Sequence, residues 1–113
     1  MRTVTLGLSS IEEAMDRTAA AFRGEPQGEF ITFISADLLW RVLTAKRWEI
    51  LQAMTGQGEM AIREIARRVG RDVKAVHGDV HGLLKAGVIE RGALGVVFPY
   101  DAVHVDFTLT KAA

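Results

Sequence analysis

The chain has 113 residues, of which 49% are hydrophobic and 25% are charged, and it contains no cysteine. The lack of cysteine excludes disulfide bonds, thiolate metal sites and thiol nucleophiles. No apolar run approaches the length of a membrane span, and the first ten residues alternate between polar and apolar instead of forming a signal-peptide core. We therefore expect a cytoplasmic protein with no membrane partner.

Basic and acidic residues balance at 14 each, but they are unevenly distributed. Residues 40–91 hold ten basic and six acidic side chains, a net charge of +4. The remainder holds four basic and eight acidic side chains, a net charge of −4. This asymmetry indicates a basic segment that carries the main binding function and an acidic remainder that contacts a different partner.

The first 34 residues predict a strand, a helix and a second strand. Alternation over residues 3–8 indicates a half-buried strand with Val4, Leu6 and Leu8 on one face. Ser9 and Ser10 lie three residues before Glu12 and Glu13, a capping-box pattern that begins a helix over residues 11–22. The apolar face of this helix consists of Ile11, Met15, Ala19 and Phe22. After a loop over residues 24–28, the β-branched and aromatic residues of 29–34 predict the second strand.

Helices dominate the next segment. A short helix from Ser35 is expected to turn inward Leu38, Leu39, Val42 and Leu43. Thr44 is typical of a fresh N-cap, and the helix over residues 45–55 is expected to bury Trp48, Leu51 and Met54. A two-turn helix over 62–69 ends at Gly70, and a longer one over 72–86 ends at Gly87.

Residues 88–99 then predict a β-hairpin, and residues 103–109 alternate as a last strand with Val103, Val105, Phe107 and Leu109 on one side. A short helix, a tight glycine turn, a longer helix and a hairpin form the order of a helix-turn-helix unit with a wing. The sequence thus predicts an α+β fold in three parts. These are an N-terminal strand-helix-strand extension for dimerisation or partner binding (1–34), a winged helix-turn-helix (35–99) and a C-terminal strand with its tail (100–113).

Two runs in this region, LTAKRWEILQAM and IREIARRVGRDVKAVHGDVHGLLKAGVIER, resemble winged helix-turn-helix transcriptional regulators of the MarR/ArsR-like kind. The pattern is most similar to small prokaryotic DNA-binding proteins that are often encoded beside a toxin-like gene, and it extends from Thr44 to Leu109. The resemblance implies a sequence-specific regulator of duplex DNA, acting as an autorepressor on a palindromic operator and as a homodimer. It also implies a toxin protein encoded nearby as an alternative main partner, which would make the chain an antitoxin.

The third helix of this unit is expected to read DNA from the face opposite its core. At 100° per residue, its core face consists of Val73, Val76, Val80, Leu83 and Leu84. The opposite side holds Arg71, Gly78 and Gly82, with Ala75 and Lys85 close by; Lys74 and His81 form one shoulder, and His77 lies nearer the core boundary. The predicted DNA-binding residues are Arg63, Arg67, Arg71, Lys74, Ala75, His77, Gly78, His81, Arg91, Lys46 and Arg47.

Gly78 and Gly82 depart from the resemblance, since the relatives commonly carry longer polar or basic side chains there. Each glycine costs a helix interior roughly 1 kcal/mol relative to alanine. Three readings stay open: the glycines admit the DNA backbone closely, they form a helix-packing contact, or they stand at unselected surface positions.

Other chemistry has less support. His77 and His81 have the i, i+4 spacing of a metal pair, which would make a metal-responsive repressor, but two imidazoles are too few for a closed site. His104 or an acid from another chain would have to complete it, so we expect no metal and no cofactor. There is no nucleophile elbow, phosphate loop or carboxylate cluster, so we expect no enzyme.

Two dimer surfaces are conceivable. The short strands from the two ends of the chain are expected to form a small sheet covered on one face by the helix over 11–22, and an open edge of that sheet would pair with a second copy. In the competing arrangement the helices over residues 37–55 form the dimer.

Overall fold

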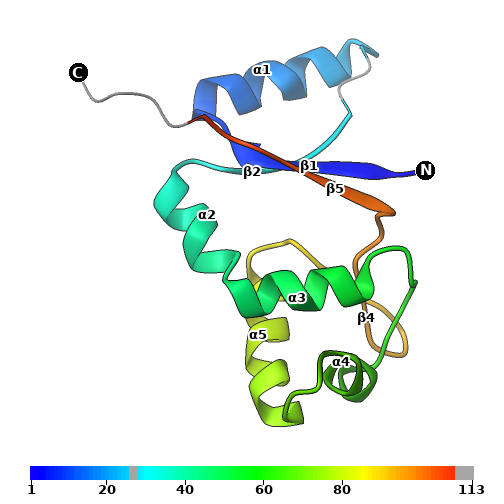
Figure 1. Ribbon diagram of the computed structural model, residues 1–113. Coiled ribbons are helices and arrows are strands. Elements are labelled where there is room, and N and C mark those ends of the chain that lie inside the picture. Colours follow the sequence, from blue (N-terminus) through cyan, green and yellow to red (C-terminus); the bar gives the residue numbers. More distant parts are fainter. Residues whose placement is uncertain (26–27, 109–113) are drawn as a thin grey trace.

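A three-stranded sheet lies between one helix and a unit of helices in the computed structural model, which describes residues 1–25 and 28–108 (Figure 1). None of the helices in these residues is long and apolar enough to cross a membrane. The described elements, in chain order, are β1 (Thr3–Leu8), α1 (Ile11–Phe22), β2 (Glu29–Phe33), α2 (Ala36–Val42), α3 (Ala45–Met54), α4 (Ile62–Val69), α5 (Val73–Lys85), β3 (Glu90–Arg91), β4 (Val96–Val97) and β5 (Ala102–Asp106).

The sheet joins the two ends of the chain. Its order is β2-β1-β5 and both pairings are parallel, so Leu6 of β1 lies opposite Ile31 on one side and Val105 on the other. The parallel pairing of β1 and β2 follows from the helix that connects them, because parallel neighbours need a crossover. The predicted small sheet is therefore confirmed, while Leu109, which we placed in its last strand, lies outside the described residues.

One core connects the sheet to the helical unit. Val4 and Leu6 of β1 are fully buried, and Phe33 of β2 belongs to the same cluster as Leu39, Ile50 and Leu83. Side chains alternate between the two faces of a strand, so the same alternation that buries Val4 and Leu6 places Thr3, Thr5 and Gly7 on the face toward α1. The α+β class is confirmed, with the terminal strands sharing one sheet.

Helix ends follow from local chemistry. Ser10 Oγ accepts a hydrogen bond from Glu13 N–H at 3.0 Å, and Thr44 Oγ1 accepts one from Arg47 N–H at 3.2 Å, so both expected caps form. Gly70 ends α4 in the left-handed conformation, with φ 66°, where a side chain would be strained. These caps set where each helix begins and ends, independently of what the helix packs against.

The helical unit consists of α3, α4, α5 and the β3–β4 hairpin. The strands of the hairpin are antiparallel, and Met60, just before α4, forms a bridge with Val96. Its interior is apolar and tightly closed, with the fully or nearly fully buried side chains of Ile50, Leu51, Met54, Ile65, Val76, Val80, Leu83, Ile89 and Phe98.

Several predicted core positions are wrong. Leu38 is 37% exposed and Val73 is 43% exposed, while Trp48 is only partly buried and the neighbouring Ile50 is fully buried instead. The apolar face of α1 is also open, since Ile11 and Met15 are each 65% exposed and Phe22 is 89% exposed. This helix does lie over the sheet (Figure 1), but its buried residue is Ala20, and Arg17 reaches Phe30 of β2, so the apolar stripe is not the side that contacts the sheet. Periodicity identified the stripe without revealing whether anything covers it.

Candidate nucleic-acid interface

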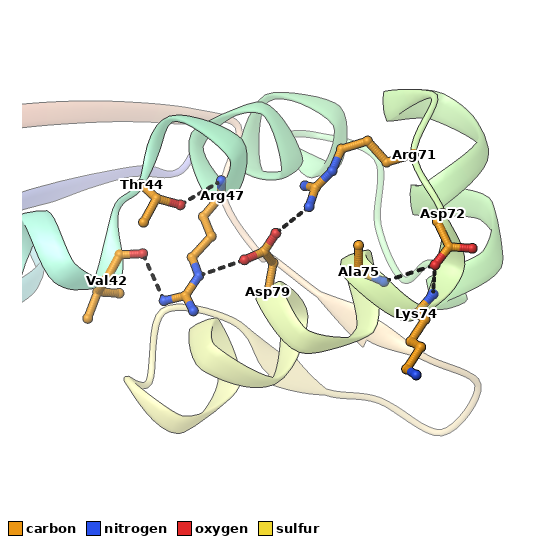
Figure 2. A network of polar contacts seen from close by, with 8 residues as sticks. All are labelled: Val42, Thr44, Arg47, Arg71, Asp72, Lys74, Ala75 and Asp79. Carbon is orange, nitrogen blue, oxygen red and sulfur yellow. Dashed lines mark hydrogen bonds and ion pairs between the residues drawn. The ribbon is translucent and has the colours of Figure 1, made fainter.

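The turn at Gly70 directs α5 away from α4. Beyond Gly70, the Arg71 N–H donates to the carbonyl of Ala66 at 3.1 Å, which satisfies the end of α4. Asp72 then caps α5, since its carboxylate accepts the N–H groups of Lys74 and Ala75 at 3.1 and 3.4 Å. The negative side chain at the first turn also complements the helix dipole. Figure 2 shows Lys74 extending from this turn away from the other charged groups.

The open face of α5 is basic and carries little bulk. Lys74, Ala75, His77, Gly78 and His81 are all exposed. The rings of His77 and His81 stack, with centroids 5.7 Å apart and planes 16° from parallel. His77 is thus exposed and lies away from the core boundary where we expected it.

Asp79 organises the opposite side of α5 by binding two arginines. Arg71 Nη2 donates to its Oδ2 at 2.7 Å and Arg47 Nε donates to its Oδ1 at 3.1 Å (Figure 2). The three side chains are only 17–21% exposed. Burial raises the pKa of Asp79, but the hydrogen bonds from Arg71 and Arg47 outweigh it, and the pKa lies below its ordinary value. The side chain of Arg71 is therefore turned inward, where we had expected it on the outward face.

The two glycines of α5 have different surroundings. A Cβ at Gly78 would meet nothing within 4 Å, whereas one at Gly82 would lie 2.5 Å from Arg47 Nη2. Arg47 is held there by Asp79 and by the carbonyl of Val42, which accepts from Nη1 at 3.3 Å. Gly82 is thus a packing position, and the exposed face of α5 is centred closer to Lys74 and His81 than the predicted one.

On α4, a single carboxylate binds two of the three arginines. Glu64 forms ion pairs with Arg67 and with Arg68, the latter at 3.1 Å. Hydrogen bonds from Arg67 first, and Arg68 second, lower the pKa of Glu64 to about 2. The i, i+4 spacing of Glu64 and Arg68 predicts the second of these pairs from the sequence alone. Arg63 is exposed and makes no ion pair with any residue in the described part of the chain.

The hairpin turn is held by Glu59, a residue that the sequence analysis missed. Its Oε1 accepts the N–H groups of Leu94 and Gly95 at 2.5 and 2.8 Å. A Cβ at Gly92 would lie 2.0 Å from the same carboxylate, so a larger residue there would displace the Glu59 side chain from its present position. The exposed Arg91 side chain precedes this turn. Glu59 lies 35 residues before Leu94 in the sequence, so no local pattern connects it to this turn.

The lysines and arginines of the predicted site therefore fall into two groups. Arg47 and Arg71 are drawn inward by Asp79, and Arg67 is paired with Glu64. The remaining cations of the site are exposed and form no ion pair within residues 1–25 and 28–108; they are Lys46, Arg63, Lys74 and Arg91. In the same residues, no three His, Asp or Glu side chains are grouped so that they could hold a metal ion.

A family model matches residues 42–105, more than half of the chain. The chain belongs to the HVO_A0114 family. The HVO_A0114 match begins at the last residue of α2 and runs through α3, α4, α5 and the hairpin into β5. It therefore includes the exposed cations Lys46, Arg63, Lys74 and Arg91 and excludes β1, α1 and β2. The comparisons with curated proteins and with solved structures gave no match.

Proposed function

We propose that this protein is a transcriptional regulator of the winged helix-turn-helix kind, which binds duplex DNA sequence-specifically as a homodimer and represses its own gene. In this proposal α4 and α5 are the helix-turn-helix, with Gly70 in the turn, and the β3–β4 hairpin is the wing. Two observations support it: the elements follow one another in this order along the chain, and α3 packs against both α4 and α5.

The exposed face of α5 is the observation that carries the proposal. Lys74 and His81 project from it, and Gly78 leaves room for a groove edge to approach the helix backbone. Two of the nearby acids, Glu64 and Asp79, are already bound by arginines, and the carboxylate of Asp72 accepts the N–H groups of Lys74 and Ala75 as the cap of α5. A helix with this combination of basic groups, small residues and neutralised acids suits the major groove.

Each group then has a distinct task. Lys74, His77 and His81 reach base edges or phosphates from α5, and Ala75 and Gly78 allow close approach. Arg63 and Lys46 contact the phosphate backbone from α4 and α3, and Arg91 contacts it from the wing. Arg47 and Arg71 act as positioning residues, because the ion pair of Arg47 with Asp79 links α3 to α5 and that of Arg71 ties the turn before α5 to the same carboxylate.

Footprinting on the DNA upstream of the protein's own coding sequence tests this function. We expect a two-fold symmetric protected site with half-sites about one helical turn, roughly 34 Å, apart. Affinity for a shuffled site of the same length is the control. Equal affinity for both sequences at physiological salt would refute specific recognition.

A further inference from the structure

The exposed stripe of α1 borders an open sheet edge. Together they form an apolar groove of about 450 Å³. Its main lining residues are Ile11, Met15, Thr18 and Phe22 of α1 and Thr32 and Ile34 of the β2 segment. We propose that this groove is the homodimer interface, in which a second copy of the chain pairs β2 with β2 and packs α1 against α1.

The edge of β2 is unprotected. Among the described residues, β2 pairs with β1 alone, and its sequence EFITF carries a charge only at its first residue, Glu29. The other edge strand, β5, exposes His104 and Asp106, and charged groups on an edge strand oppose strand addition. The aromatic ring after β5, Phe107, already packs edge-on against Trp40 at 5.4 Å. Strand addition is therefore favoured at β2.

Charge on α1 is arranged to leave the groove side neutral. At 100° per residue, the sector that faces the β2 edge holds Ile11, Ala14, Met15, Thr18, Ala21 and Phe22. Glu12 and Asp16 lie on the opposite flank, and Arg17 turns toward the sheet, where its guanidinium lies 4.7 Å from the ring centre of Phe30. Depletion of charge is what distinguishes the centre of a protein interface from ordinary surface.

The exposed area suits a second copy. Ile11, Met15 and Ile34 are each 65% exposed and Phe22 is 89% exposed. If a large apolar side chain carries on the order of 150–200 Å², these four present roughly 500 Å² per chain. Complete burial of these side chains in two copies would remove up to roughly 1,000 Å², which reaches the threshold of a specific interface before strand pairing is added.

A two-fold axis perpendicular to the sheet satisfies both contacts. It makes β2 and its copy antiparallel neighbours in one six-stranded sheet, with strands about 4.8 Å apart. Because α1 lies over the strands it joins, the two α1 axes would then be on the order of 10 Å apart, the spacing of packed helices. The axis also keeps both helical units on the opposite side of the sheet, so both α5 faces point the same way. That last consequence, the match to a palindromic site, rests on the proposed function; the dimer does not.

Light scattering of the full chain without DNA tests the dimer. We expect a dimer for the wild type and a monomer with unchanged helical content for Phe22→Glu and Met15→Glu, because both side chains are exposed within one chain. Leu94→Glu, at an 85% exposed position in the hairpin turn, is the matched control and should remain dimeric.

Cysteine cross-linking locates the contact, since the chain has no cysteine of its own. The Thr18→Cys variant, on the groove side of α1, should form an intermolecular disulfide on mild oxidation. The Asp16→Cys variant, on the opposite flank, should not form this disulfide.

A monomeric wild type, including one that associates only with the product of a neighbouring gene, would overturn the proposal. So would a dimer that survives Phe22→Glu and Met15→Glu and shows no Thr18→Cys cross-link. A dimer that fits these results without recognising its upstream DNA would overturn the proposed function alone.

Discussion

The guanidinium of Arg47 occupies the space that a side chain at Gly82 would fill, with Nη2 only 2.5 Å from the position of a Cβ. The glycine therefore lets an arginine from α3 cross α5 and reach Asp79 one turn earlier in the helix. A Cβ at Gly78, which lies one turn before Gly82 and directly precedes Asp79, would have no neighbour within 4 Å. Two glycines that look alike in the sequence thus serve different purposes.

Alanine at these two positions should have opposite effects on stability. Gly78→Ala gains helix propensity without a clash and should raise the free energy of unfolding by up to ~1 kcal/mol. Gly82→Ala displaces Arg47 from Asp79 and should lower it by about 1 kcal/mol, since the lost charged hydrogen bond outweighs the propensity. In an Arg47→Ala background, Gly82→Ala should become stabilising. Urea denaturation of Gly78→Ala, Gly82→Ala, Arg47→Ala and the double variant gives these free energies of unfolding. Equal effects of alanine at both glycines would contradict the proposal that Gly82 makes room for Arg47.

The ion pairs of Asp79 predict a specific pH dependence. Its folded-state pKa lies below the ordinary value of 3.8, so the ionised carboxylate adds stability that is complete well above that value. This stability is lost as the pH falls through the folded-state pKa. We expect Asp79→Asn to be less stable than wild type by about 1–2 kcal/mol at pH 7, and the difference to shrink below pH ~4.

Urea denaturation between pH 3 and pH 7 gives this difference directly. Glu64 also titrates in acid, with a pKa of about 2, but it is present in both proteins and cancels. A gap between wild type and Asp79→Asn that stays constant down to pH ~3 would show that Asp79 carries no depressed pKa.

Under the proposed function, the exposed cations should contribute separately to DNA binding. Lys74→Ala and Arg63→Ala should each weaken binding and lower the slope of log affinity against log salt by about 1, if each side chain neutralises one phosphate. Arg63→Ala should do so equally for operator and random DNA. Arg41→Ala, which removes one exposed charge from α2, is the control. Unchanged slopes for Lys74→Ala and Arg63→Ala would place the DNA on another surface.

Glu59 should hold the hairpin turn in place. Glu59→Ala leaves the N–H groups of Leu94 and Gly95 without their acceptor and should lower the free energy of unfolding by about 1 kcal/mol. Amide hydrogen exchange at these two residues should become faster than in the wild type. Glu49→Ala removes an exposed acid from α3 and serves as the control. Unaltered exchange in Glu59→Ala would mean that the turn is stable by itself.

Helix positions were predictable because the signals that set them are local. Ser10, Thr44 and Asp72 cap the helices that follow them, and Gly70 ends α4 in a conformation that glycine adopts without strain. The same reasoning identified α5, most of its buried face and the β3–β4 hairpin. Each of these conclusions depends on residues within a few positions of one another in the chain.

Contacts between distant segments needed the tertiary structure. Nothing near Arg71 in the sequence indicates that Asp79 will turn its side chain inward together with Arg47, 32 residues earlier than that aspartate. Helical periodicity likewise marks Ile11, Met15 and Phe22 as one stripe but cannot say which side of α1 meets the sheet. Periodicity describes a single element, whereas burial and ion pairing depend on which other elements the whole chain brings against it.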